Sequence, residues 1–263
     1  MAHPDILVFD HFKSFPQLVH GVFSRKGGMS TGSHASLNIG LNCGDDEPAV
    51  VQNRNYMMDT LGVVRAVFLN QVHGTEIKVL KQGEDIKAVT WDKGFGRTPC
   101  PISADGIVTN IRDLALVIQV ADCQAVMLYD PVNQVIANVH SGWRGSVANI
   151  IGRCVQVMAE AFSSQPRDIF AGISPSLGPC CAEFIHYKRE IPKSLWAYKL
   201  KGGSYFDFWT LSCDQLVEKG VKKENILSMG ICTQCRADRF FSFREEKNTG
   251  RFGAVIAVTK ERG

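Results

Sequence analysis

Apolar stretches with the composition of β-strands recur along the chain, and they constrain its fold more than any other feature. They are rich in Val, Ile and Phe and are bounded by Gly, Pro, Asn or Asp. Several are apolar on both faces, which is typical of strands covered on both sides by other layers. We expect strands at residues 63–69, 106–109, 114–128, 135–139, 169–173, 226–229 and 252–259.

Three helices are expected among these strands. The clearest spans about 146–162, where apolar residues recur at helical spacing and Ser146 is a good N-cap. The other two cover 48–61 and 208–219. Strands and helices are mixed without a regular βαβ order, so the sequence predicts the α+β class. We interpret the Gly- and Pro-containing stretch 83–103 as a long loop inside one domain of residues 1–263.

Charge and cysteine content exclude several classes of protein. The 263 residues carry 29 Lys and Arg against 26 Asp and Glu, and this net charge of +3 is too small to favour nucleic acid as a partner. No apolar stretch reaches the roughly 18 residues of a membrane span, and the first residues lack the layout of a signal peptide. Nine cysteines without such a signal favour reduced thiols in a cytoplasmic protein, and hence thiol chemistry or metal binding.

Two histidines and one cysteine stand out as candidates for chemistry. His73 ends an expected strand, Cys123 lies inside the longest apolar run, and His140 lies where a strand meets the clearest helix. The strands on either side of the Pro/Asn turn are expected to form a hairpin. If Pro131 opposes Gln134, Cys123 and His140 are diagonal neighbours on one sheet face, about 7–8 Å apart. A register shifted by one residue would put them on opposite faces.

This set of three side chains fits more than one chemistry. Two His and one Cys with a fourth position open are the ligands of a catalytic zinc site, which polarises a substrate or lowers the pKa of its bound water to about 7. The same ligands suit copper. Without a metal, Cys123 and His140 would act as a nucleophile and its base. The residues alone leave these three possibilities open.

Ordered motifs run through nearly the whole chain. They include His20-Gly21-Val22-Phe23-Ser24-Arg25, Gln71-Val72-His73-Gly74, Ala121-Asp122-Cys123, His140-Ser141-Gly142-Trp143-Arg144-Gly145, Gly178-Pro179-Cys180-Cys181, Phe240-Phe241-Ser242-Phe243-Arg244 and Thr249-Gly250-Arg251. In these motifs the chain resembles the laccase-domain family, which is also described as multicopper polyphenol oxidoreductases or as YfiH-like purine nucleoside phosphorylases.

The resemblance implies that His73, Cys123 and His140 form the metal-binding and catalytic group, usually with zinc. It also implies a single α+β domain of two packed mixed β-sheets flanked by helices, the YfiH architecture. The implied activities are phosphorolysis of adenosine, inosine and 5′-methylthioadenosine to free base and ribose 1-phosphate, and adenosine deamination. Copper-dependent phenol oxidation and amide hydrolysis in the editing of cell-wall precursors are the implied alternatives.

The histidine content bears on the phenol oxidase alternative. A multicopper oxidase needs many histidines, commonly as His-X-His pairs, whereas this chain has seven and none are so spaced. A single site with two His and one Cys still binds Cu(II). We therefore rank phenol oxidation below nucleoside chemistry.

Phosphorolysis requires cations beside a bound nucleoside. Arg54 and Arg144 are the candidates for binding phosphate, and Arg144 adjoins an expected helix N-terminus, which favours anions. Asn38 is the candidate contact for ribose or base. Deamination also needs a carboxylate as general acid/base, for which we favour Asp105 because Asp122 should point away from Cys123. The expected partners are therefore small molecules, bound by a monomer or homodimer.

Four further cysteines form one Cys-Cys pair and one CxxC motif. They are Cys180, Cys181, Cys232 and Cys235. A single CxxC without a second one favours free thiols over a second zinc site with four thiolates or a redox pair.

Overall fold

The apolar runs form two mixed β-sheets in the computed structural model, which describes residues 4–93 and 102–259. The first sheet contains, in spatial order, β1 (Ile6–Leu7), β2 (Leu18–Phe23), β13 (Phe252–Val258), β8 (Ala115–Val120), β3 (Arg65–Asn70) and β5 (Trp91–Asp92), with β6 (Ile102–Ser103) paired to β3. The second contains β12 (Ile226–Ser228), β11 (Phe170–Ile173), β9 (Gln124–Asp130), β10 (Val135–Ser141), β7 (Gly106–Thr109) and β4 (Ile77–Leu80). Each sheet has parallel and antiparallel pairs, such as β3 with β8 and β13 with β8.

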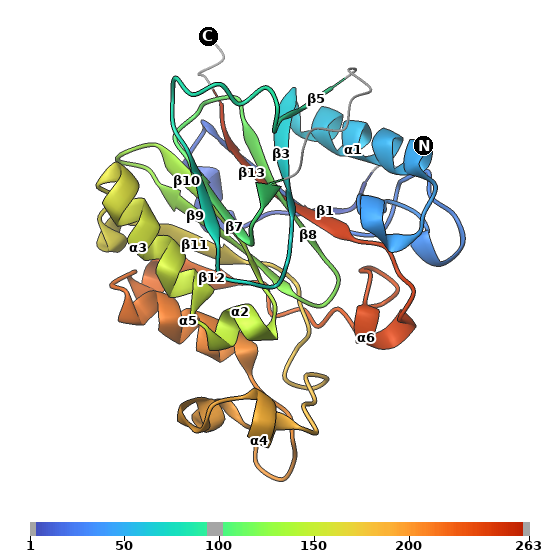
Figure 1. The fold of residues 1–263 in the computed structure, drawn as a ribbon, viewed down its shortest axis with the longest axis vertical. Helices are drawn as coiled ribbons and strands as arrows, with labels where there is room; N and C mark the ends of the chain where they lie inside the picture. Colours follow the sequence, from blue (N-terminus) through green and yellow to red (C-terminus); the bar gives the residue numbers. More distant parts are fainter. Residues whose placement is uncertain (1–3, 94–101, 260–263) are drawn as a thin grey trace.

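Helices cover the two outer faces of the paired sheets (Figure 1). The first sheet packs against α1 (Glu47–Leu61), and the second packs against α3 (Ile150–Phe162) and α5 (Phe208–Glu218). Shorter helices are α2 (Trp143–Val147), α4 (Tyr187–Glu190) and α6 (Phe243–Glu246), with 3₁₀ turns at Asp10–Ser14, Gly32–His34, Leu41–Cys43, Pro166–Asp168, Lys193–Tyr198 and Lys223–Asn225. Among the described residues, no helix is long and apolar enough to cross a membrane.

In the described residues the core consists of three apolar layers and a fourth, smaller cluster around Phe206 and Phe208. Leu116 and Met127 belong to the layer between the two sheets. Met57 of α1 packs with Phe68 beneath the first sheet, and α3 packs against the outer face of the second. Strands buried on both faces are the physical reason for the apolar runs without alternation. The predicted α+β fold with two packed mixed sheets flanked by helices is confirmed.

Two of the expected elements are corrected by the structure. The run 114–128 is not one strand, because the chain leaves β8 in the first sheet, turns at Asp122 with a φ of 82°, and enters β9 in the second. The helix expected at 146–162 is split into α2 and α3, because Asn149 adopts a φ of 54° and accepts a hydrogen bond from the Gly152 amide as the N-cap of α3. Ser146 therefore does not cap the long helix.

The stretch expected to be a loop, 83–103, lies partly outside the described residues. Its described ends carry the short strands β5 and β6. The remaining expected strands and the helices α1 and α5 are found close to their expected bounds, while β1, β2 and β4 had not been expected.

Candidate active site

His73, Cys123 and His140 meet where the two sheets come together. His73 follows β3 of the first sheet, His140 lies in β10 of the second, and Cys123 lies in the turn that joins β8 to β9. One ligand atom of each lies within 4.8 Å of those of the other two. The rings of His73 and His140 are 4.8 Å apart, edge to face. The structure thus brings together the three residues that the sequence singled out.

The hairpin register explains how Cys123 comes to face the histidines. Ser141 pairs with Gln124, as the predicted turn requires, so Cys123 comes opposite Gly142. A Cβ atom at Gly142 would lie 2.9 Å from Nδ1 of His73 and 3.1 Å from Sγ of Cys123. Since a Cβ essentially never comes as close as 2.9 Å to another atom, the glycine at this position leaves the space beside His73 and Cys123 open.

One buried carboxylate orients both histidines. Oδ1 of Asp105 lies 2.8 Å from Nδ1 of His140 and accepts the backbone N–H of His73 at 2.9 Å, while Oδ2 accepts that of Gly74 at 2.6 Å. Burial opposes ionisation of Asp105, but the hydrogen bonds and charge of His140 and the backbone amides lower its pKa below the usual value. Nε2 of His140 is left for a metal or a substrate.

This geometry differs from the role that the sequence suggested for Asp105. Its side chain is fully buried and its oxygens are occupied by the groups just described, and it is not among the residues that line the neighbouring cavity. Asp105 is therefore a positioning residue rather than a general acid/base that faces a substrate.

The thiol of Cys123 is poised to ionise. Burial alone would raise its pKa, but the charge of His140 and hydrogen bonds with His140 and His73 lower the pKa to about 6. Burial would likewise lower the pKa of His140, but the Cys123 thiolate and the Asp105 carboxylate raise it to about 9. These opposite shifts favour a thiolate–imidazolium pair, and the thiolate is the form of cysteine that binds metals and acts as a nucleophile.

The three side chains fit a metal ion in their donor chemistry. They offer one sulfur and two ring nitrogens, Asp105 fixes the ring of His140, and Gly142 leaves room between them. Three protein donors with an open side toward a cavity are typical of catalytic rather than structural zinc sites.

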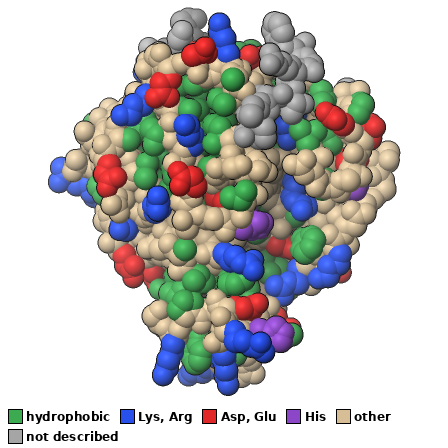
Figure 2. All heavy atoms as spheres, in the orientation of Figure 1, with side chains coloured by type: hydrophobic (Ala, Val, Ile, Leu, Met, Phe, Trp, Pro, Cys, Tyr) green, Lys and Arg blue, Asp and Glu red, His purple; other side chains and the backbone are tan. Residues whose placement is uncertain are grey.

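The group opens into a cavity of about 830 Å³, a size that suits small-molecule ligands. Cationic and aromatic side chains line it together with the three ligands: Arg54, Arg144, Arg244 and Arg251, and Phe68, Trp143, Phe184, Phe208 and Phe243. On the face shown in Figure 2, several Lys and Arg side chains lie near a histidine at the centre, among apolar and acidic ones. The cavity therefore combines positive charge with apolar walls.

The two predicted phosphate ligands line this cavity in different ways. Arg54 is buried, donates to the carbonyl of Ile39 at 2.9 Å and to Oε1 of Gln119 at 3.2 Å, and stacks on Phe68 at 3.9 Å. Arg144 is exposed and stacks over its neighbour Trp143 at 4.3 Å. Arg54 is thus held rigidly, whereas the guanidinium of Arg144 is accessible to an anion from solvent.

Asn38, the predicted contact for ribose or base, is not brought into the cavity. It is fully buried, and its Oδ1 accepts the backbone N–H groups of Gly40 at 2.9 Å and of Arg251 at 2.7 Å. Its Nδ2 donates to Oδ2 of Asp45 at 2.8 Å. Asn38 therefore holds together the loops below the cavity instead of facing a substrate.

The sequence did not assign a role to the network that fixes the Cys123 turn. Oδ1 of Asp122 accepts the hydroxyls of Thr233 and Ser242, both at 2.7 Å, and Oδ2 accepts the backbone N–H of Arg244 at 2.6 Å. Asp122 lies in the turn rather than in a strand, and its carboxylate anchors the C-terminal segment. Arg244 and Arg251, which also line the cavity, end two of the ordered motifs, so the sequence offered a means of finding them as site residues.

Comparison with known proteins identifies the same family as the sequence motifs. Residues 19–259 match the family described as multi-copper polyphenol oxidoreductase laccase. The chain belongs to this family. It is 32% identical to the purine nucleoside phosphorylase YlmD of Geobacillus stearothermophilus over 94% of this chain and 92% of that protein. It is 30% identical to the purine nucleoside phosphorylase YfiH of Escherichia coli over 89% of this chain and 90% of that one.

A solved structure of the family shares the fold. The hypothetical protein YfiH of Bacillus licheniformis superimposes with a TM-score of 0.84, covers 98% of this chain and 97% of its own, and is 28% identical. The names of the relatives support an enzyme that acts on small molecules.

Proposed function

We propose that the protein is a zinc-dependent purine nucleoside phosphorylase. The observation that carries the proposal is that a single cavity holds the two-His, one-Cys group, four arginines and several aromatic side chains. These are the groups that a phosphate, a purine and a departing base require. Adenosine, inosine and 5′-methylthioadenosine are the proposed substrates, which yield the free base and a ribose 1-phosphate.

In this reaction an oxygen of phosphate forms a bond to C1′ of the sugar as the bond from C1′ to the purine nitrogen breaks. The base takes the electron pair of the broken bond and a proton. Arg54 and Arg144 would bind the phosphate, since guanidinium groups pair well with phosphate oxygens. The aromatic side chains around Phe208 would hold the purine by stacking.

His73, Cys123 and His140 would act on the nucleoside rather than on the phosphate. A bound zinc ion supplies a Lewis acid at the point where Cys123, His73 and His140 converge. Asp105 accepts the Nδ1 proton of His140, so Nε2 is the ring nitrogen that would give up its proton and bind the ion. The thiolate of Cys123 contributes a negative charge that needs no proton removal at neutral pH.

The test is release of free base from each nucleoside by zinc-loaded protein with and without phosphate. We expect release that requires phosphate and is lost in Cys123→Ala. In Arg144→Ala, KM for phosphate should rise more than kcat falls, whereas Arg153→Ala, an exposed arginine on α3, serves as the matched control. Absence of phosphate-dependent release from all three nucleosides would contradict the proposal.

Adenosine deamination is a second reaction proposed for the same site. A water activated at the two-His, one-Cys group would add to the purine ring, as in zinc deaminases. The assay is ammonia release from adenosine, which should persist without phosphate and disappear in Cys123→Ala.

A metal-free hydrolase is the alternative that one observation favours. The thiolate–imidazolium pair of Cys123 and His140 is also the arrangement of a Cys-His nucleophile and its base. This alternative predicts amide hydrolysis that resists chelators and a thiolate that iodoacetamide traps in metal-free protein. Activity that chelators abolish would exclude it. Copper-dependent phenol oxidation, the other alternative, predicts turnover of phenols by copper-loaded and not by zinc-loaded protein.

A cytoplasmic location and a monomeric or homodimeric state complete the proposal. Reduced cysteines favour the first. Light scattering of the purified protein measures the second.

A further inference from the structure

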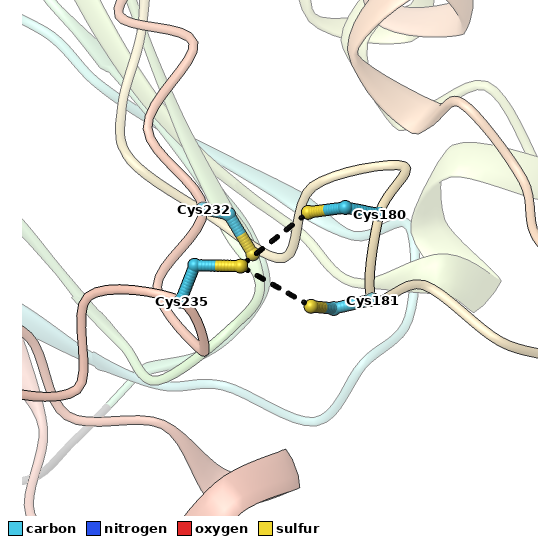
Figure 3. Close-up of side chains that lie close together, drawn as sticks. All are labelled: Cys180, Cys181, Cys232 and Cys235. Carbon is cyan, nitrogen blue, oxygen red and sulfur yellow. Dashed lines mark hydrogen bonds between the residues drawn. The ribbon is translucent and has the colours of Figure 1, made fainter.

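A second cluster of metal-binding side chains lies outside the candidate active site. Cys180 and Cys181 come from one loop, Cys232 and Cys235 come from another, and their sulfurs all lie within 4.8 Å of one another. Figure 3 shows the four side chains pointing toward a common centre from the two loops. Two segments about fifty residues apart in the sequence thus place four thiols together.

The spacing of the sulfurs matches a metal site better than a disulfide. Sγ of Cys235 lies 3.6 Å from that of Cys180 and 3.5 Å from that of Cys181. In a tetrahedral site with Zn–S bonds of about 2.3 Å, neighbouring sulfurs are roughly 3.8 Å apart. A disulfide requires about 2.05 Å and joins only two of the four sulfurs.

The surroundings of the cluster supply a stabilised thiolate and access for an ion. Cys232 is buried, and its sulfur accepts the backbone N–H of Gly178 at 3.3 Å. Cys180 and Cys235 are exposed, which leaves a path for the ion to enter.

We propose that Cys180, Cys181, Cys232 and Cys235 form a structural zinc site, separate from the group in the cavity. Four protein thiolates fill the tetrahedral shell and leave no position for a substrate, which is the mark of a structural rather than a catalytic site. Binding of the ion releases the thiol protons that remain. This replaces the free thiols that the sequence favoured.

The site would fix one wall of the cavity. Ser176, which precedes the first cysteine loop, pairs with Cys232 as an isolated β-bridge. From the same two loops, the N–H of Leu177 donates to the carbonyl of Asp122 at 2.8 Å and the hydroxyl of Thr233 donates to its carboxylate at 2.7 Å. The zinc site would therefore hold in place the loops that anchor the turn carrying Cys123.

The experiment is metal analysis of purified full-length protein that carries Cys123→Ala, so that the cavity group no longer contributes. We expect one zinc ion per chain in this protein, and none after Cys232→Ser and Cys235→Ser are added. Cys213→Ala, a partly buried cysteine of α5 outside the cluster, serves as the matched control and should retain the ion. Cobalt in place of zinc should give the intense visible bands of a tetrahedral thiolate site.

A second measurement does not depend on the folding of the variants. In wild-type protein the four cysteines should resist alkylation until a strong chelator is added, as mass spectrometry of the labelled peptides would show. The proposal is overturned if the Cys123→Ala protein holds no zinc, or if the two serine substitutions leave the zinc content unchanged. A pair of cluster cysteines found as a disulfide in freshly purified protein would also overturn it.

Discussion

Replacement of Asp105 by Asn tests whether one carboxylate prepares the candidate metal group. The wild-type side chain accepts hydrogen bonds from four directions: the ring of His140 and the backbone N–H groups of Val72, His73 and Gly74. An amide has one acceptor oxygen and one NH₂ group, so it cannot accept on both sides. The variant must therefore lose one half of this arrangement, whichever way the amide turns.

Each orientation has a definite consequence. If the NH₂ group faces the amides of Gly74 and Val72, two partly buried donors lose their acceptor, at no more than about 1–3 kcal/mol each. If the NH₂ group faces His140 instead, Nδ1 must act as the acceptor, so the ring proton moves to Nε2 and that nitrogen no longer binds a metal. Because water can reach these donors in part, we expect the free energy of unfolding to fall by about 1–3 kcal/mol in the first case. In the second case we expect zinc affinity to fall by about 10- to 100-fold.

The assay combines urea unfolding of metal-free protein with zinc competition against a chromophoric chelator. Asp130→Asn is the matched control, because Asp130 is also fully buried and accepts the backbone N–H groups of Val132 at 2.9 Å and Asn133 at 3.1 Å, outside the cavity. The control should lose stability and keep its zinc affinity. Wild-type stability together with wild-type zinc affinity in Asp105→Asn would refute the positioning role.

Two further predictions concern the same site and the core. In Gly142→Ala the new Cβ would lie 2.9 Å from His73 and 3.1 Å from Cys123 and would displace both side chains. Zinc affinity should therefore fall about tenfold or more, while circular dichroism shows an unchanged fold. An unchanged zinc affinity would contradict this prediction. Burial lowers the pKa of His20 to about 4, so the unfolded chain binds the proton at a higher pH than the folded one. The free energy of unfolding should therefore fall by about 3 kcal/mol as the pH drops from about 6.5 to 4. In urea titrations His20→Gln should remove this part of the loss of stability in acid, and identical pH profiles of the variant and the wild type would count against the prediction.

Local signals in the sequence were sufficient to predict the pairing that brings Cys123 near His140. The turn with Pro131 and Gln134 fixes the register, and the strands around it are long enough to keep that register to the site. His73 stood out as a histidine that ends an expected strand, and the resemblance placed it with the other two; it follows β3 of the other sheet. The grouping of His73, Cys123 and His140 could therefore be predicted from the sequence.

Other features depended on tertiary structure that local patterns do not carry. The switch between sheets at Asp122 is hidden because β8 and β9 are both buried on both faces, so the apolar composition continues through the turn. Asn38 and Asp105 are polar residues one or two positions before a glycine, a pattern shared by substrate ligands and by residues that bind backbone amides. Only the hydrogen-bond partners of Asn38 and Asp105 in the folded structure separate these two roles.

The positions of the three ligands connect the site to the stability of the whole fold. His73 follows a strand of the first sheet, His140 lies in a strand of the second sheet, and Cys123 lies in the turn by which the chain passes from one sheet to the other. An ion bound by all three would resist any sliding of the layers past each other, and it would add about 4 kcal/mol to stability at a thousandfold excess over its dissociation constant. Loss of the ion should thus loosen the contact between the layers before it affects the packing of α3 against its own sheet.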